Sequence, residues 1–238
     1  MTNRVEQVMG LPISLDLRDE GDFAEAVDDV FAWLRDVDAR FSPFKEDSEV
    51  SRYDRGELTA AELSEDLLEV LELCAYYEQL SGGAFRARLP GRGLDPCAVV
   101  KGWAVQRAAD LLKAEGAATF CLNAGGDVVA AGRPWRVGIR HPLDAHAVAA
   151  VVEAEDLAIA TSALYERGDH VVAPGGRRPD GVLSVTVTGP DLGIADAYAT
   201  AALAMGSDGP AWTLRLDGYE ALTILADETV RSTPGFPA

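Results

Sequence analysis

The chain has 238 residues and carries 39 acidic against 21 basic side chains, which gives a formal net charge of −18. This excess of carboxylates excludes a nucleic-acid backbone or an anionic membrane surface as the main partner, because both select clustered Lys and Arg. Hydrophobic residues make up 48% of the chain, a proportion typical of a globular protein rather than a disordered one.

The cysteines and the N-terminal residues indicate the cellular compartment in which we expect the protein. Cys74, Cys97 and Cys121 lie far apart and suit neither a disulfide framework nor a zinc site, so we expect small, buried hydrophobic side chains. The start of the chain lacks the apolar segment of a signal peptide, and no apolar run approaches the length of a membrane span. We therefore expect a cytoplasmic protein without membrane insertion.

Helices dominate the predicted elements of the first half of the chain. Alternating apolar residues predict a strand over 13–17. Three- and four-residue apolar spacing predicts a helix over 22–40, a second that starts at Ser64 and is ended by Gly82-Gly83, and a third over 96–116 that Asp95 caps. The polar stretch 42–56 predicts a long loop.

The second half of the chain predicts mostly strands, because short apolar runs alternate with Gly, Pro and Asp. The predicted strands are 119–122, 128–130, 136–139, 148–152, 157–160, 171–172, 182–187, 221–225 and 229–231. One helix is predicted over about 192–205. The absence of a linker or repeat favours a single α+β domain over 1–238, in which helices flank mostly antiparallel sheets.

Two short motifs could bind an anion. Asp95 and Lys101 fall on the first turns of one predicted helix, where Asp95 could simply cap the helix or, with Lys101 and the open space at Gly102, form a site for a phosphate or anionic ring. Asn123-Ala-Gly-Gly-Asp127 could be a plain hairpin turn or a nest of N–H groups around a ligand.

Two other motifs offer hydroxyls and a titratable base. Thr161 and Ser162 end a predicted strand, and His170 follows as either a base or a polar residue at a strand end. Asp196 and Thr200 are four residues apart and therefore share one face of an apolar helix. They could stabilise that helix locally, or they could offer oxygen ligands to a hard cation such as Mg²⁺.

The order of these motifs resembles the ApbE family, the FAD:protein FMN transferases, from about residue 9 to 206. The motifs that carry the resemblance are Met9-Gly10, Phe41-Ser-Pro-Phe44, Ser81-Gly-Gly-Ala-Phe85, Leu94-Asp-x-x-Ala-x-x-Lys-Gly-Trp-Ala104, Asn123-Ala-Gly-Gly-Asp127, Ala160-Thr-Ser162, His170 and Ala195-Asp-Ala-x-Ala-Thr200. The resemblance implies an ApbE or T-fold-like domain that transfers the FMN part of FAD to a Ser or Thr hydroxyl of an acceptor flavoprotein, with Mg²⁺.

The resemblance also implies the site residues. Asp196, Thr200 and the backbone oxygen of Ala98 would hold Mg²⁺, and His170 with Asp196 would be catalytic. The implied FAD site contains Met9, Phe44, Ala84, Phe85, Asp95, Lys101, Asn123, Gly125, Gly126, Asp127 and Ser162.

Three positions depart from the family pattern: Arg86, Gln106 and Ala173 replace acidic residues that many members carry. These departures keep two alternatives open. The chain could hold FAD or FMN without turnover, or it could be a Mg²⁺-dependent FAD pyrophosphatase.

Overall fold

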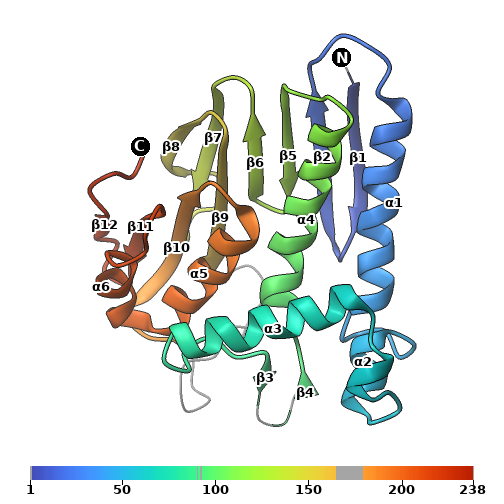
Figure 1. The fold of residues 1–238 in the computed structure, drawn as a ribbon. Helices are drawn as coiled ribbons and strands as arrows, with labels where there is room; N and C mark the ends of the chain where they lie inside the picture. The colour runs from blue at the N-terminus through green and yellow to red at the C-terminus, as the bar shows by residue number, and fades with distance from the viewer. Residues whose placement is uncertain (1, 90, 92, 165–178, 238) are drawn as a thin grey trace.

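The computed structural model describes residues 2–89, 91, 93–164 and 179–237 of the chain. Its centre is an eight-stranded sheet in which every neighbouring pair is antiparallel, and β1 and β12 form the two edges (Figure 1). In spatial order the strands are β1 (Thr2–Val8), β2 (Leu11–Leu17), β5 (Phe120–Ala124), β6 (Asp127–Ala131), β9 (Leu157–Ala163), β10 (Val182–Gly189), β11 (Glu220–Leu225) and β12 (Val230–Ser232).

Three helices lie against one face of the sheet, and a fourth crosses them (Figure 1). The three are α1 (Ala24–Phe41), α4 (Cys97–Ala114) and α5 (Leu192–Ala204), and α3 (Glu65–Leu80) crosses α4 and α5. The short helices α2 (Glu49–Asp54) and α6 (Gly209–Thr213) complete this layer. Mixed helices and a mostly antiparallel sheet confirm the predicted α+β class.

Two hairpins stand outside the main sheet. One pairs β3 (Arg88–Leu89) with β4 (Gly93–Leu94), and the other pairs β7 (Trp135–Arg140) with β8 (Val148–Ala154). Val129 of β6 packs in the large core between the sheet and the helices, whereas the adjacent Val128 packs with Ile139 and Val152 of the β7–β8 hairpin. Successive side chains of a strand point to opposite faces, so β6 is buried on both.

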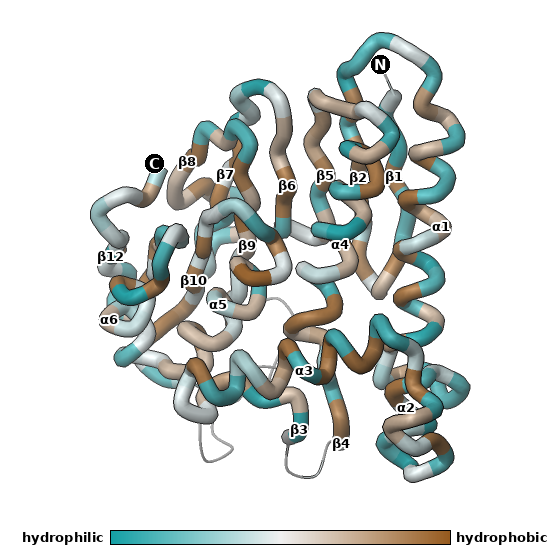
Figure 2. The backbone as a smooth tube through the Cα atoms, in the orientation of Figure 1, coloured by the Kyte–Doolittle hydropathy of each residue, from teal (hydrophilic) through white to brown (hydrophobic). Residues whose placement is uncertain are grey.

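Apolar spacing accounts for the main helices. In α1 the buried residues include Val27, Val30, Phe31 and Leu34, which form one stripe, and the hydropathy in Figure 2 alternates along this helix. Ser64 caps α3 as predicted, because its Oγ accepts the Leu67 N–H at 3.3 Å. Among the residues described, no helix is both long and apolar enough to cross a membrane.

The structure corrects three details of the predicted elements. The predicted loop 42–56 contains α2, whose start is capped by Ser48 through the Ser51 N–H and whose Val50 is fully buried. Helix α4 begins at Cys97, one residue later than predicted, because Pro96 takes the cap position expected for Asp95, and the Asp95 carboxylate accepts the Cys97 N–H at 3.0 Å. The edge strand β1 was not predicted, and the predicted strand 171–172 lies outside the described residues.

Candidate functional site

Helices α4 and α5 cross closely because Gly102 has no side chain. A Cβ built at Gly102 would lie 2.7 Å from Cβ of Asp196 and 2.8 Å from the Leu192 carbonyl oxygen, both shorter than real contacts. At this crossing the Gly102 N–H donates to Oδ2 of Asp196 at 3.0 Å. In a regular α-helix the N–H of Gly102 points along the helix axis toward the carbonyl of Ala98, four residues earlier.

A buried charge cluster surrounds Asp196. Nζ of Lys101 lies 2.5 Å from Oδ2 of Asp127 and 3.6 Å from Oδ1 of Asp196. The side chains of the two aspartates are 1% and 2% exposed, and that of Lys101 is 16% exposed. Buried charges are stable only when they are paired, so these three groups depend on one another.

Hydroxyl groups lie one helical turn from Asp196. Thr200 follows Asp196 on α5, and its Oγ1 lies 3.0 Å from Oγ of Ser162 on β9, a hydrogen bond in which either hydroxyl can donate. Ser162 is itself buried. The structure therefore brings together Lys101, Asp127 and Asp196, and it pairs Ser162 with Thr200.

The motif Asn123-Ala-Gly-Gly-Asp127 forms a hairpin turn between the antiparallel strands β5 and β6. Gly125 and Gly126 both have positive φ, at 62° and 108°, which favours glycine. The Gly125 N–H donates to the Pro12 carbonyl, and the Gly126 N–H donates to Oδ1 of Asn123 at 2.9 Å. These N–H groups bond within the protein, and a role for the turn in FAD binding stays a prediction.

A cavity of about 560 Å³ opens beside Lys101. Its walls come from the β1–β2 turn, from α1 and the segment after it, and from α4, and they include Met9, Val37, Phe44, Cys97 and Lys101. Met9 has a positive φ of 55°, which fixes it in the tight turn to Gly10. Phe44 is 84% exposed and stands at the rim.

Ala84 and Phe85 lie in the hydrophobic core instead. Both are buried, and among the described residues that line the cavity beside Lys101 neither occurs. The Phe85 N–H donates to Oγ of Ser81 at 2.9 Å, and its ring packs against Tyr77 with 6.0 Å between centroids. A flavin-binding role for these two residues stays a prediction, as does one for Asp95, and His170 lies outside the described residues.

Within the described part of the chain, no three His, Cys, Asp or Glu side chains gather as metal ligands. The candidate metal donors are instead one carboxylate, of Asp196, one hydroxyl, of Thr200, and one backbone carbonyl, of Ala98. All are oxygen donors, which is the chemistry that Mg²⁺ prefers. The ammonium of Lys101 lies 3.6 Å from Oδ1 of Asp196, so this carboxylate already interacts with one cationic group.

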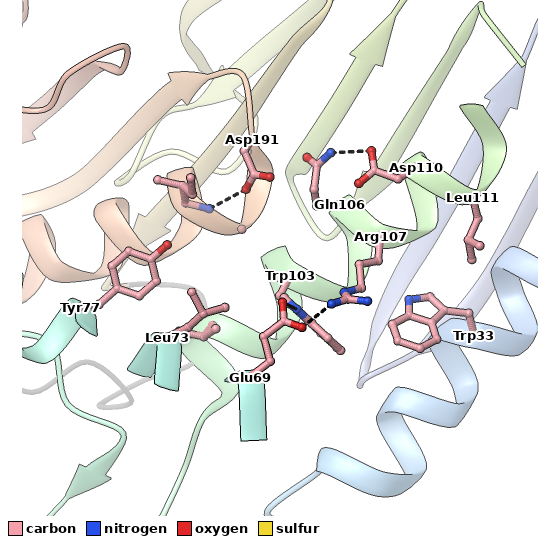
Figure 3. A pocket seen from close by; sticks show the side chains of 13 residues that line it. Trp33, Glu69, Leu73, Tyr77, Trp103, Gln106, Arg107, Asp110, Leu111 and Asp191 are labelled. Atoms are coloured by element: carbon pink, nitrogen blue, oxygen red, sulfur yellow. Dashed lines mark hydrogen bonds and ion pairs between the residues drawn. The ribbon is translucent and has the colours of Figure 1, made fainter. Parts of the chain in front are cut away.

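A second cavity, of about 610 Å³, was not predicted. It lies on the other side of α4, against α1, α3 and the start of α5, and no described residue of the predicted site lines it. Figure 3 shows Glu69 in its middle, ion-paired with Arg107 and accepting the Trp103 indole N–H at 3.0 Å, with Trp33 and Tyr77 on opposite sides. Because four helices form this cavity, no local pattern in the sequence could have indicated it.

Two of the departures from the family pattern have structural roles. Oε1 of Gln106 accepts the Leu192 N–H at 2.8 Å, and its Nε2 donates to Oδ1 of Asp110 at 3.0 Å (Figure 3). Gln106 thus ties α4 to the start of α5. Arg86 is exposed and donates from Nε to the Gly83 carbonyl at 2.9 Å. Ala173 lies outside the described residues.

Solved structures of similar proteins match this fold. "Flavin Transferase ApbE from Vibrio cholerae" superposes with a TM-score of 0.84 at 22% sequence identity, covering 99% of this chain and 97% of that one. The ApbE protein from Thermotoga maritima superposes with a TM-score of 0.86 at 20% identity, covering 98% and 97%. At these identities the likeness establishes the fold alone.

Sequence comparison identifies the family. An "FAD:protein FMN transferase" of Rhodobacter capsulatus is 34% identical over 184 residues, which are 67% of this chain and 35% of that protein. One of Vibrio cholerae is 31% identical over 145 residues, 54% of this chain and 43% of that protein. The match therefore spans less than half the length of these curated relatives. The model described as "ApbE family" matches residues 9–89 and 86–223, so the chain belongs to the ApbE family.

Proposed function

We propose that this protein transfers the FMN part of FAD to a Ser or Thr hydroxyl of an acceptor flavoprotein, with Mg²⁺. The observation that carries the proposal is the buried group of Lys101, Asp127 and Asp196 at the side of a cavity of about 560 Å³. Relatives named "FAD:protein FMN transferase" support the same activity.

The cavity beside Lys101 suits the flavin end of FAD. Met9 and Phe44 provide apolar surface for a planar ring system, while Lys101 provides a positive charge for the diphosphate. Because the whole chain carries a net charge of −18, an anionic substrate needs such a local positive group to bind.

The proposed reaction breaks the phosphoanhydride bond between the two halves of FAD and forms a phosphate ester with the acceptor hydroxyl. The acceptor hydroxyl oxygen attacks the phosphorus of the FMN half, the bond to the AMP half breaks, and AMP leaves. The hydroxyl proton passes to a base, for which we propose His170. Bound Mg²⁺ would neutralise charge on the diphosphate, and the donors we assign to it are Asp196, Thr200 and the Ala98 carbonyl. The task of the protein is positioning and charge neutralisation.

An acceptor assay tests the proposal. The protein is incubated with FAD, Mg²⁺ and a candidate flavoprotein, and the products are identified by mass spectrometry. We expect FMN covalently attached to a Ser or Thr of the acceptor, together with free AMP. Free FMN and AMP with an unmodified acceptor would indicate a pyrophosphatase, and unchanged FAD across a panel of acceptors would indicate a binding protein. Asp196→Ala is the matched inactive control.

A further inference from the structure

We propose that the cavity of about 610 Å³ between α1, α3, α4 and the start of α5 binds a small organic cation, an ammonium group carried on an aromatic body. This cavity lies on the other side of α4 from the proposed FAD site, so the inference does not depend on the proposed function. Its volume is that of pockets that enclose small organic molecules, which combine apolar walls with a few polar groups that orient the ligand.

The walls of the cavity provide aromatic and aliphatic surface. Trp33 and Tyr77 stand on opposite sides (Figure 3), and the indole N–H of Trp33 already donates to the Ala104 carbonyl at 3.0 Å. The Arg107 guanidinium lies 4.7 Å from the centroid of the Trp103 ring, so this cavity already holds one cation against an indole. The aliphatic part of the lining is Leu73, Val99 and Leu111. An aromatic ligand body therefore finds apolar surface here.

The hydroxyl group of Tyr77 indicates that the cavity takes a polar ligand. Tyr77 is 4% exposed, and its hydroxyl forms no hydrogen bond within the part of the chain that the structure describes. A phenol can both donate and accept, and a buried polar group without a partner costs free energy. In Figure 3 this hydroxyl points toward the side of the cavity where Asp191 lies. A ligand bound there would supply the missing partner.

Asp191 adds a carboxylate on that side of the cavity. Its Oδ1 accepts the Ile194 N–H at 2.9 Å and so caps α5, whereas its Oδ2 has no hydrogen bond to any residue that the structure describes. Burial is the main cause that raises the pKa of the Tyr77 phenol, and the charge of Asp191 raises it further. The phenol is therefore neutral at physiological pH. Tyr77 and Asp191 thus provide two oxygen acceptors for one ammonium group.

The charges of the lining favour a cation over an anion. Glu69 and Arg107 compensate each other as an ion pair. Asp110 accepts a hydrogen bond from the Gln106 amide and Asp191 accepts one from a backbone N–H, and both of these donors are neutral. Three carboxylates and one guanidinium line the cavity, which leaves an excess of two negative charges. A positively charged ligand is attracted by this excess, and an anionic ligand is repelled.

Calorimetric titration of the full chain with three matched ligands tests the inference. Tryptamine carries the ammonium group on an indole, tryptophol replaces that group by a neutral hydroxyl, and indoleacetate replaces it by a carboxylate. We expect tryptamine to bind at least about ten-fold more tightly than tryptophol, because hydrogen bonds that involve a charged group are stronger than neutral ones. Indoleacetate should bind more weakly than either.

Two conservative variants locate the bound amine. Tyr77→Phe removes only the hydroxyl and should weaken tryptamine binding about five-fold or more. Asp191→Asn keeps a capping side chain on α5 and should weaken tryptamine binding about ten-fold or more, while the affinity for tryptophol changes by less than about three-fold. Glu72→Gln removes an exposed carboxylate of α3 and is the charge-matched control, for which we expect a change below about two-fold.

Four results would overturn the inference. Absence of tryptamine binding would remove this class of ligand, and equal binding of tryptamine and tryptophol would show that the site does not recognise charge. A loss in Glu72→Gln as large as that in Asp191→Asn would indicate attraction to the acidic surface as a whole. If circular dichroism shows that Asp191→Asn does not fold, Tyr77→Phe decides, because unchanged tryptamine affinity in that variant would place the amine elsewhere.

Discussion

Replacement of Gly102 by Ala should destabilise the protein, although helix propensity alone predicts the opposite. In a helix interior Ala is favoured over Gly by about 1 kcal/mol. The added Cβ, however, would meet Cβ of Asp196 at 2.7 Å, the Leu192 carbonyl oxygen at 2.8 Å and Cα of Gly193 at 3.0 Å. Two of these three atoms are backbone, so α4 and α5 have to separate.

The cost has two parts. Forcing extra volume into a packed crossing costs about 1–3 kcal/mol. Separation of the helices also weakens the hydrogen bond from the Gly102 N–H to the Asp196 carboxylate, and bonds to charged groups are worth about 1.5–3 kcal/mol. After the gain in propensity, we expect a net loss of about 2–5 kcal/mol. For a chain of this size that corresponds to a melting temperature lower by about 4–20 °C.

Differential scanning calorimetry of Gly102→Ala and the wild type measures this shift. Ala32→Gly, at an exposed position of α1, is the control for propensity alone and should cost about 1 kcal/mol. A Gly102→Ala variant that melts at or above the wild-type temperature would refute the close crossing of α4 and α5 at Asp196.

Other consequences can be tested on the thiols and on the proposed catalytic groups. Cys97 lines the cavity beside Lys101, so a maleimide should label it first and FAD should slow that labelling. Cys74 and Cys121 should react far more slowly, because burial raises the pKa of their thiols to about 12 and about 11. If FAD leaves the rate of Cys97 labelling unchanged, the flavin does not bind in this cavity. The free energy of unfolding should fall as the pH rises from about 9 to 12, since the unfolded chain releases the Cys74 proton first, and the loss reaches about 4 kcal/mol. Urea titrations of Cys74→Ala should lack that part of the slope, and an identical slope would contradict the assignment. His170→Ala should lower FMN transfer about 10²–10⁴-fold with FAD affinity unchanged, whereas Asp196→Ala should lower both. A His170→Ala variant that transfers normally but binds FAD poorly would remove His170 as the base.

Local apolar periodicity predicted the long elements well. The helix expected over 22–40 occurs at Ala24–Phe41, since its apolar stripe is continuous and faces the core. The edge strand β1 has no such pattern, because Val5 is 61% exposed and lies between Arg4 and Glu6. Its pairing with β2 depends on the two-residue turn formed by Met9 and Gly10. Such a turn leaves no periodic pattern of hydrophobic residues in the sequence.

The candidate site was predictable as a set of residues but not as a set of contacts. Lys101 and Asp127 were both expected near FAD, yet their ion pair depends on β6 lying beside α4. Likewise, the contact between Gly102 and Asp196 follows from the crossing of two helices that are remote in sequence. Such geometry is fixed by tertiary packing. Phe85 is buried in the core, which the motif did not indicate, and its contact with FAD stays a prediction.

The open sheet ends in two different ways at its edges. On β1, Arg4 forms ion pairs with Glu6 and Asp28, and Arg35 of α1 pairs with Glu6 as well. On the opposite side, β12 has only three residues. Exposed strand edges are templates for pairing with another chain, and both charged side chains and short strands discourage it. A further strand would have to desolvate these ion pairs on one side and would find few backbone groups on the other, so self-assembly through sheet extension is disfavoured at both edges.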